Sequence, residues 1–192
     1  MSLTDAQIDR YSRQIIVPRI GGRGQERLLA ARILLVGDAR DIEAPLDYLV
    51  GAGVGTICLK LSGDRAAFPE KRELNPNVTI TLVDESQDRV DLALMIMGSE
   101  AARTAAAEVA NSRDVLAAVI ARLDTPGKIA IFPDARDARS VDAKFGTRAE
   151  AADFIAMLAT SEAFKLIAGY SENPSTTTIE FDGYETRVRI NP

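Results

Sequence analysis

The sequence predicts an α/β fold in which a doubly wound, Rossmann-like sheet carries helices on both faces. Two short apolar runs, 33–36 and 57–59, are typical of buried parallel strands, and glycines flank them. Between these runs, Leu46, Leu49 and Val50 recur at helical spacing. A strand, a helix and a strand in this order form a βαβ unit, and nucleotides bind at such units in doubly wound folds.

Four further strand signals follow in the chain. The β-branched run 78–83 and the apolar run 91–98 each predict a strand, the second one fully buried. The runs 115–121 and 128–132 are joined by a turn signal of sequence DTPG, which predicts an antiparallel pair. The sheet is therefore expected to be parallel in its N-terminal half.

The end of the chain predicts a β-hairpin over residues 176–190, because two alternating segments flank an Asp-Gly turn. Together with the antiparallel pair before it, this hairpin makes the C-terminal half of the sheet mixed. No repeat and no low-complexity linker interrupts the pattern. We expect a single domain over residues 1–192.

Capping signals place the helices. Residues 4–7 (TDAQ) have the form of a capping box and predict a helix that carries Tyr11. The glycines of 21–24 predict a bend before a short helix over 25–31. Ser99 predicts the N-cap of an alanine-rich helix. A second capping box at 147–150 (TRAE) predicts the start of the last helix, which Gly169 ends.

Composition narrows the function. The 192 residues contain 23 Lys and Arg against 28 Asp and Glu, with no basic run, so neither a nucleic-acid nor an anionic-membrane surface is indicated. No apolar stretch reaches membrane-spanning length, and the N-terminus lacks signal-peptide features, so we expect a cytoplasmic protein. The single cysteine, Cys58, lies inside an apolar run and is interpreted as a packing residue.

The turn after the first strand (GDARDIE) is where a nucleotide phosphate would bind. Only Gly37 remains of the fingerprint G-x-G-x-x-G, whose glycines let backbone approach a phosphate. Asp38, Asp41 and Glu43 place negative charge where a helix N-terminus attracts anions. We interpret the turn as structural, with a carboxylate capping its own helix. The alternative is a variant phosphate loop that uses Arg40.

Four segments of the first 60 residues have the form of a known family: 10–16 (RYSRQII), 21–25 (GGRGQ), 28–37 (LLAARILLVG) and 49–57 (LVGAGVGTI). With these segments the chain resembles the start of the ThiF/MoeB/HesA family, whose members are relatives of the ubiquitin-activating enzymes. Weaker similarity follows at 74–78 (LNPNV), 162–169 (EAFKLIAG) and 189–192 (RINP). The resemblance therefore extends over most of the chain and implies the same fold.

The family adenylates the C-terminal glycine of a ubiquitin-like or sulphur-carrier protein with MgATP, and this chain departs from its pattern. Lys60 stands where the family has an acidic residue that holds the ribose. The family's long crossover segment supplies Asn, Arg and Lys to the phosphates, and here it is shortened to residues 65–73. Arg65, Lys71 and Arg72 are candidate substitutes there, although isolated charges are usually solvated.

The metal sites of the family are also missing. Its Mg²⁺-binding Asp is replaced by Ser99 and Glu100, and an acid in the first helical turn mostly acts as a partner of the helix dipole. Neither the C-x-x-C zinc half-site nor the substrate-binding crossover loop of many relatives is recognisable around 134–140. We therefore expect no metal and no cofactor, although the family uses MgATP.

Arg13 is the candidate catalytic residue. In the resembled family the enzymes are dimers, and the second Arg of R-Y-x-R-Q reaches the partner's ATP phosphates as an arginine finger. Arg13 keeps that position. A competing interpretation is that Arg10 and Arg13 brace their helix through ion pairs with Asp9 or Glu26.

The sequence thus predicts a degenerate family member that acts as a dimeric scaffold or supplies Arg13 to an active homologue. The expected partner is a second copy or a ThiF/MoeB-type homologue, and a ubiquitin-like or sulphur-carrier protein is a further candidate. The first alternative is an active adenylyltransferase. The second is a nucleotide-binding sensor or oxidoreductase on a Rossmann-type fold, which the missing glycines and Lys60 oppose.

Overall fold

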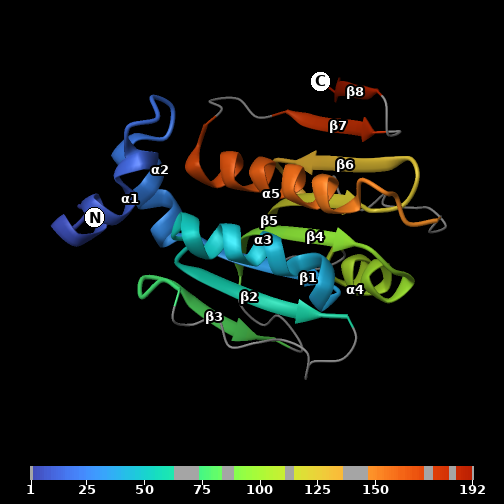
Figure 1. Ribbon diagram of the computed structural model, residues 1–192, viewed down its shortest axis with the longest axis horizontal. Coiled ribbons are helices and arrows are strands. Elements are labelled where there is room, and N and C mark those ends of the chain that lie inside the picture. Colours follow the sequence, from blue (N-terminus) through green and yellow to red (C-terminus); the bar gives the residue numbers. More distant parts are fainter. Residues whose placement is uncertain are drawn as a thin grey trace.

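The computed structural model describes residues 2–62, 74–83, 89–110, 115–135, 147–170, 175–181 and 185–191. These residues fold around an eight-stranded sheet with the strand order β3-β2-β1-β4-β5-β6-β7-β8 (Figure 1). The shortened crossover segment 65–73 and most of the region 134–140 lie outside the described residues.

The N-terminal half of the sheet is parallel and its C-terminal half is mixed, as the sequence predicts, because β5 pairs parallel with β4 and antiparallel with β6. The five parallel strands are β1 (Arg32–Gly37), β2 (Thr56–Leu61), β3 (Thr79–Leu82), β4 (Val90–Met97) and β5 (Val115–Arg122). The three antiparallel additions are β6 (Gly127–Phe132), β7 (Thr176–Phe181) and β8 (Thr186–Asn191). The expected pair and hairpin are both confirmed.

Helices cover both faces of the sheet, which confirms the predicted α/β architecture. One face carries α3 (Ala39–Ala52) and α5 (Ala152–Ala168), which lie side by side in Figure 1, and α2 (Gly21–Ala30) packs at their end. The other face carries α4 (Glu100–Ala110). The first helix, α1 (Asp5–Ile15), packs against α2.

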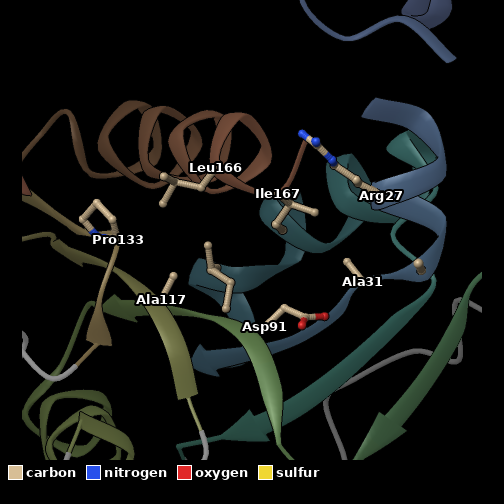
Figure 2. A pocket seen from close by; sticks show the side chains of 9 residues that line it. Arg27, Ala31, Asp91, Ala117, Pro133, Leu166 and Ile167 are labelled. Carbon is tan, nitrogen blue, oxygen red and sulfur yellow. The ribbon is translucent and has the colours of Figure 1, made fainter. Parts of the chain in front are cut away.

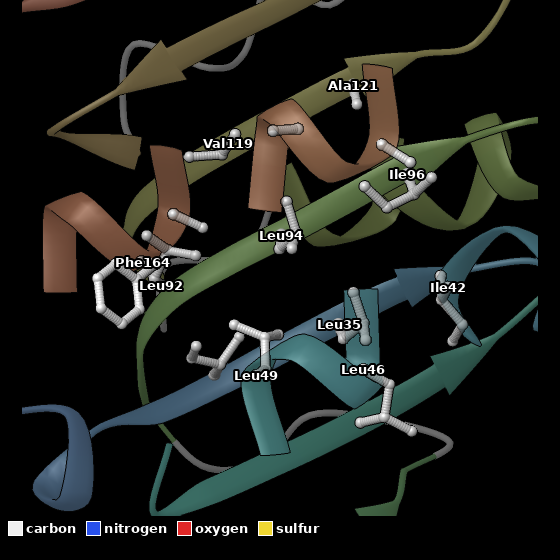
Figure 3. Close-up of a cluster of buried hydrophobic side chains, with 14 of the residues drawn as sticks. Leu35, Ile42, Leu46, Leu49, Leu92, Leu94, Ile96, Val119, Ala121 and Phe164 are labelled. Carbon is white, nitrogen blue, oxygen red and sulfur yellow. The ribbon is translucent and has the colours of Figure 1, made fainter. Parts of the chain in front are cut away.

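Side chains alternate between these two layers along each buried strand. In β1, Leu35 belongs to the cluster under α3 and α5, whereas Leu34 belongs to the cluster under α4. Figure 3 shows the larger cluster, in which Leu46 of α3 and Phe164 of α5 cover the strands. Cys58 of β2 is buried in the smaller cluster, and its sulfur lies 3.6 Å from the Thr81 hydroxyl. The thiol therefore lies in a packing environment.

The start of α2 differs from the sequence prediction. The helix begins at Gly21, so the glycines of 21–24 are helical rather than a bend before Gln25. A Cβ at Gly24 would lie 2.9 Å from Ile20 Cγ2 and 3.2 Å from the carbonyl oxygen of Ala168. That glycine therefore permits close packing of α2 against α5, a tertiary requirement that the local pattern does not reveal.

The predicted capping box at 147–150 is wrong. The last helix begins only at Ala152, and its N-cap residue makes no side-chain capping bond. Thr147 instead accepts a backbone hydrogen bond from Thr125 at 2.9 Å, and Arg148 forms a β-bridge with Asp124. The segment is held by pairing with a distant turn.

The other capping predictions are confirmed. The capping box of α1 forms through Thr4 and Gln7, and the Ser99 hydroxyl accepts the Ala102 amide at 3.1 Å. Gly169 ends α5 in the left-handed conformation, with φ 69°. Among the helices that the structure describes, none has the length and apolar character needed to cross a membrane.

Candidate functional site

The candidate site lies where the strand order reverses. The chain leaves β1 toward β2 on one side, and β4 pairs with β1 on the other. Ligands of open α/β sheets bind outside the carboxyl ends of the strands at such a switch point. Gly37 ends β1 and Gly98 directly follows β4, so both glycines border this position.

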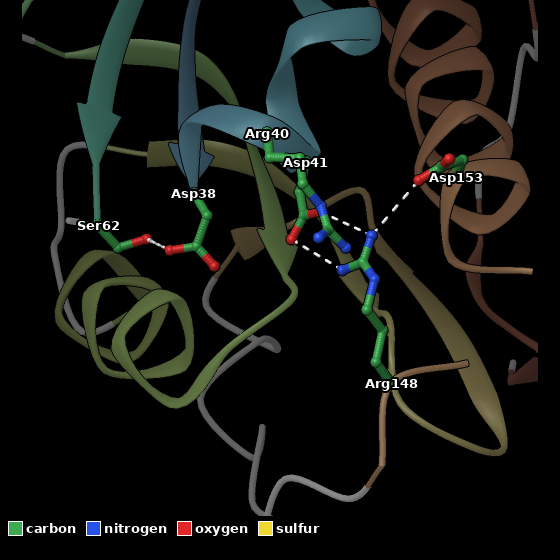
Figure 4. Close-up of polar contacts among 6 residues, drawn as sticks. All are labelled: Asp38, Arg40, Asp41, Ser62, Arg148 and Asp153. Carbon is green, nitrogen blue, oxygen red and sulfur yellow. Dashed lines mark hydrogen bonds and ion pairs between the residues drawn. The ribbon is translucent and has the colours of Figure 1, made fainter. Parts of the chain in front are cut away.

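Asp38 closes one side of the switch point (Figure 4). It is the N-cap residue of α3, but its side chain makes no capping hydrogen bond. Its carboxylate instead accepts a 2.8 Å hydrogen bond from the hydroxyl of Ser62, which follows β2. The predicted capping role is therefore wrong for Asp38, because a donor from the neighbouring strand holds the carboxylate. The contact ties the ends of β1 and β2 together.

Asp41 and Arg148 close the other side. The Asp41 carboxylate is 4% exposed, and its Oδ1 lies 2.8 Å from Nη2 of Arg148. Nη1 of Arg148 donates to Oδ2 at 3.0 Å, so the planar guanidinium meets the carboxylate with two nitrogens (Figure 4). Asp41 also lies in the first turn of α3, where the helix dipole favours negative charge. The negative charge of the buried carboxylate is thus stabilised by the Arg148 guanidinium and by the N-terminus of α3.

The positions next to both glycines are filled by the protein itself. A Cβ at Gly98 would lie 1.6 Å from Asp41 Oδ2, so the carboxylate rests directly on the backbone after β4. A Cβ at Gly37 would lie 2.7 Å from Ile42 Cγ2 and 2.7 Å from the carbonyl oxygen of Ile96. Gly37 therefore remains where a phosphate loop would begin, but it packs against a side chain of α3.

Arg40 lies at the outer rim of the site. Its side chain is 76% exposed, and its Nε is 3.7 Å from Asp41 Oδ1. It lines a hollow of about 580 Å³ that five carboxylates and two guanidinium groups border. The carboxylates belong to Asp41, Glu43, Asp47, Glu150 and Asp153. This excess of negative charge repels anions. The surroundings of Arg40 therefore disfavour phosphate binding, and its role as a phosphate ligand stays a prediction.

Lys60 and Glu100 each have a local partner. The Lys60 ammonium lies 2.8 Å from Glu108 of α4. The Glu100 carboxylate accepts hydrogen bonds from Arg103, and these bonds, with the attraction of the guanidinium, hold the pKa of Glu100 below its usual value. Among the described residues, no group of three or more His, Cys, Asp or Glu side chains is arranged to hold a metal ion. Arg65, Lys71 and Arg72 lie outside the residues that the structure describes.

Curated relatives match parts of this chain. A SAMP-activating enzyme E1 of Haloferax volcanii is 31% identical over 125 residues, which are 52% of this chain and 45% of the relative. A sulfur carrier protein adenylyltransferase of Thermus thermophilus is 48% identical over 58 residues, 30% of this chain and 21% of the relative. The chain thus matches less than half the length of either relative. No protein-family model matches it.

Solved structures share the fold over nearly the whole chain. The crystal structure of E. coli MccB superposes with a TM-score of 0.68 at 15% identity, over 98% of this chain and 70% of that one. That of PaaA gives a TM-score of 0.59 at 16% identity, over 98% and 75%. The chain is related to the ThiF/MoeB/HesA family. The resemblance predicted from the sequence is therefore confirmed.

The ThiF/MoeB-like motif RYSRQ lies on α1, away from the switch point of its own chain (Figure 1). Arg13 is exposed, and within the described residues its guanidinium has no ion-pair or hydrogen-bond partner. The bracing of Arg13 by Asp9 or Glu26 is thus not seen, although both acids lie in the described part of the chain. The structure keeps Arg13 separate from Gly37 and Arg40.

Sequence reasoning missed two contacts, one within the site and one that attaches α1 to the rest of the molecule. Arg148 was interpreted as part of a capping box, and nothing in its neighbourhood indicates a partner 107 residues away. The buried Tyr11 hydroxyl lies 3.0 Å from the Asn75 amide, which also donates to the carbonyl oxygen of Val50 at 2.7 Å. The sequence analysis used the segment LNPNV only as a weak similarity to the family, and nothing in it indicates the contact between Asn75 and Tyr11.

Proposed function

We propose that this chain is a degenerate ThiF/MoeB-like subunit that does not adenylate on its own. It acts as a dimeric scaffold, or it supplies Arg13 as an arginine finger to an active homologue. The observation that carries the proposal is the Asp41–Arg148 pair, because the Asp41 carboxylate rests against Gly98 where a nucleotide would need open backbone.

The described residues do not fit a magnesium-bound nucleoside triphosphate. A phosphate at Gly98 would have to displace the Asp41 carboxylate from Arg148, and two unpaired like charges about 4 Å apart repel by roughly 4 kcal/mol at an effective dielectric constant of 20. A micromolar complex has only about 8 kcal/mol of binding free energy, so that repulsion removes a useful site. Lys60 adds a second mismatch, because it replaces an acid and is already paired with Glu108.

Titration calorimetry with ATP and Mg²⁺ tests this part of the proposal. We expect no binding to the wild-type chain at micromolar ATP, and a gain in ATP affinity for Asp41→Ser, which removes the carboxylate that rests on Gly98. Glu43→Gln is the matched control, because it removes one charge from the rim and leaves the switch point filled. A low-micromolar dissociation constant for the wild type would contradict the proposal, as would pyrophosphate exchange with a carrier protein.

Two observations support the role of Arg13. Its guanidinium is exposed and has no partner among the described residues, so it is available to a second protein. The helix that carries it is anchored by the buried Tyr11, which fixes the direction in which Arg13 is presented. A guanidinium delivered to a partner's site supplies positive charge where negative charge develops during phosphoryl or adenylyl transfer.

The names of the relatives favour one alternative. They describe an activating enzyme and an adenylyltransferase for a sulfur carrier protein, so this chain is alternatively an active ATP-dependent adenylyltransferase with a reorganised ATP site. A ubiquitin-like or sulphur-carrier protein would then be its substrate. The same calorimetry together with a pyrophosphate-exchange assay decides between the two, since only the active form combines micromolar MgATP binding with pyrophosphate exchange.

A further inference from the structure

A second cavity lies at the amino ends of the strands, opposite to the carboxyl ends that form the switch point. It has a volume of about 440 Å³ and opens beneath the C-terminal end of α5, next to the amino ends of β1, β4 and β5 (Figure 2). This volume falls within the usual range of small-molecule sites. No motif in the sequence drew attention to it, and it shares no lining residue with the hollow around Asp41.

The walls of this cavity are apolar and its small side chains keep it open. Alanines line it from the end of α2 and from β5, where larger residues would fill the space. These alanines are Ala30, Ala31 and Ala117, and the remaining apolar lining consists of Leu92, Pro133, Leu166 and Ile167. Such walls favour an aliphatic group, because removing apolar surface from water stabilises the bound state.

Arg27 provides a positive group at the mouth of the cavity. Its guanidinium lies over Gly169, where a Cβ would be 1.7 Å from Nη1, and that nitrogen donates to the carbonyl oxygen of Ala168 at 3.4 Å. The glycine and the carbonyl hold the guanidinium in place. The group has five donors in total, so several remain for an anion. No carboxylate of the described residues pairs with it.

Asp91 provides a negative group across the mouth from Arg27, as Figure 2 shows. Its Oδ2 accepts the backbone amide of Arg32 at 2.8 Å, which orients the carboxylate at the start of β4. Within the described residues, no ion pair joins it to Arg27 or to another cation. Two opposite charges, each positioned by backbone contacts, therefore border one apolar cavity without neutralising one another.

We propose that this cavity binds a free α-amino acid with an apolar side chain. Arg27 takes the carboxylate, Asp91 takes the ammonium group, and the aliphatic side chain enters between Leu92, Leu166 and Ile167. Each charged contact is a charge-assisted hydrogen bond, and both ends must be present for full affinity. The inference depends only on this cavity and is independent of the function proposed for the switch point.

Titration calorimetry of the full chain with L-leucine tests the proposal. We expect a dissociation constant of about 1 mM or tighter. Two analogues that each lack one charge, 4-methylpentanoate and 3-methylbutylamine, should bind at least about tenfold more weakly, as should glycine, which lacks the aliphatic group. Arg27→Met and Asp91→Asn should each weaken leucine binding by a similar factor. Arg23→Met is the matched control, because this exposed Arg lies on α2 outside the cavity lining.

A variant that blocks the cavity distinguishes loss of leucine binding from loss of folding. Ala30 is exposed and lines the mouth, so Ala30→Trp should abolish leucine binding while the melting temperature stays within a few degrees. Absence of binding to the wild type at 10 mM leucine, about ten times the expected constant, would overturn the proposal. Equal affinity for leucine and 4-methylpentanoate would overturn it as well, as would unchanged binding in both Arg27→Met and Asp91→Asn.

Discussion

At the scale of single residues, the Asp41–Arg148 pair occupies the switch point next to Gly98. A carboxylate that is 4% exposed is tolerated only because a guanidinium, itself 27% exposed, faces it with two nitrogens. Removing one partner of a buried pair leaves the other uncompensated, whereas removing both leaves a cavity without a buried charge. This asymmetry makes the pair testable without a ligand.

Arg148→Ala should lower the free energy of unfolding by about 3 kcal/mol, because the Asp41 carboxylate stays buried without its partner. The double variant Asp41→Ala with Arg148→Met should lose less than the single variant. Urea unfolding followed by circular dichroism measures both. Arg40→Ala is the control and should change stability by less than about 0.5 kcal/mol, since its side chain is 76% exposed. Equal losses in Arg40→Ala and Arg148→Ala would contradict the structural role of the pair.

At the scale of elements, α1 contributes one buried side chain to the body of the molecule. Tyr11 is the single residue of this helix that is buried, and its ring packs on Gly53, where a Cβ would be 2.5 Å from the hydroxyl oxygen. Asn75 joins that hydroxyl to the last turn of α3 through the Val50 carbonyl. Because the contact lies two residues from Arg13, it also sets where the candidate finger stands.

Tyr11→Phe should keep the ring packing and lose the hydroxyl contacts. We expect stability to fall by about 1–2 kcal/mol, because part of the buried Asn75 amide loses its partner. Hydrogen exchange of the α1 amides should quicken, which mass spectrometry of the exchanged peptides measures. Tyr48→Phe is the control, since Tyr48 is 41% exposed on α3. If α1 exchanges equally fast in wild type and Tyr11→Phe, the helix is held in some other way.

Helix boundaries show what local patterns can and cannot predict. The capping box of α1 is correct because both of its partners, Thr4 and Gln7, lie within one turn. The similar pattern at 147–150 fails because Arg148 and Thr147 bond to residues that are far away in the chain. The start of α2 was misplaced for a related reason, since Gly24 lies within the helix and allows it to pack closely against α5.

At the scale of the whole molecule, the sheet was predictable because each buried strand is a short apolar run, and parallel strands of this kind need helices on both faces. The βαβ unit predicted that β1 and β2 are parallel strands of one sheet, whereas the pairing of β1 with β4, which creates the switch point, was not predicted. The contents of the switch point were not predictable, because a pairing between Asp41 and Arg148 leaves no periodic signal. The acidic turn did predict the sign of the charge there.

The arrangement of the molecule places Arg13 on α1, on a different element from the Asp41–Arg148 pair, so a finger role requires a second protein. Mixing the chain with active ThiF/MoeB-type homologues from the same cell should raise their adenylation rate. Arg13→Ala should then lower the stimulated rate by about 1,000-fold, the loss typical of an arginine finger, with little change in melting temperature. Arg10→Ala, on the same exposed helix, is the matched control and should stimulate as wild type does. If Arg13→Ala stimulates equally well, or if no homologue associates, the finger is excluded, and a homodimeric scaffold remains as the role of this fold.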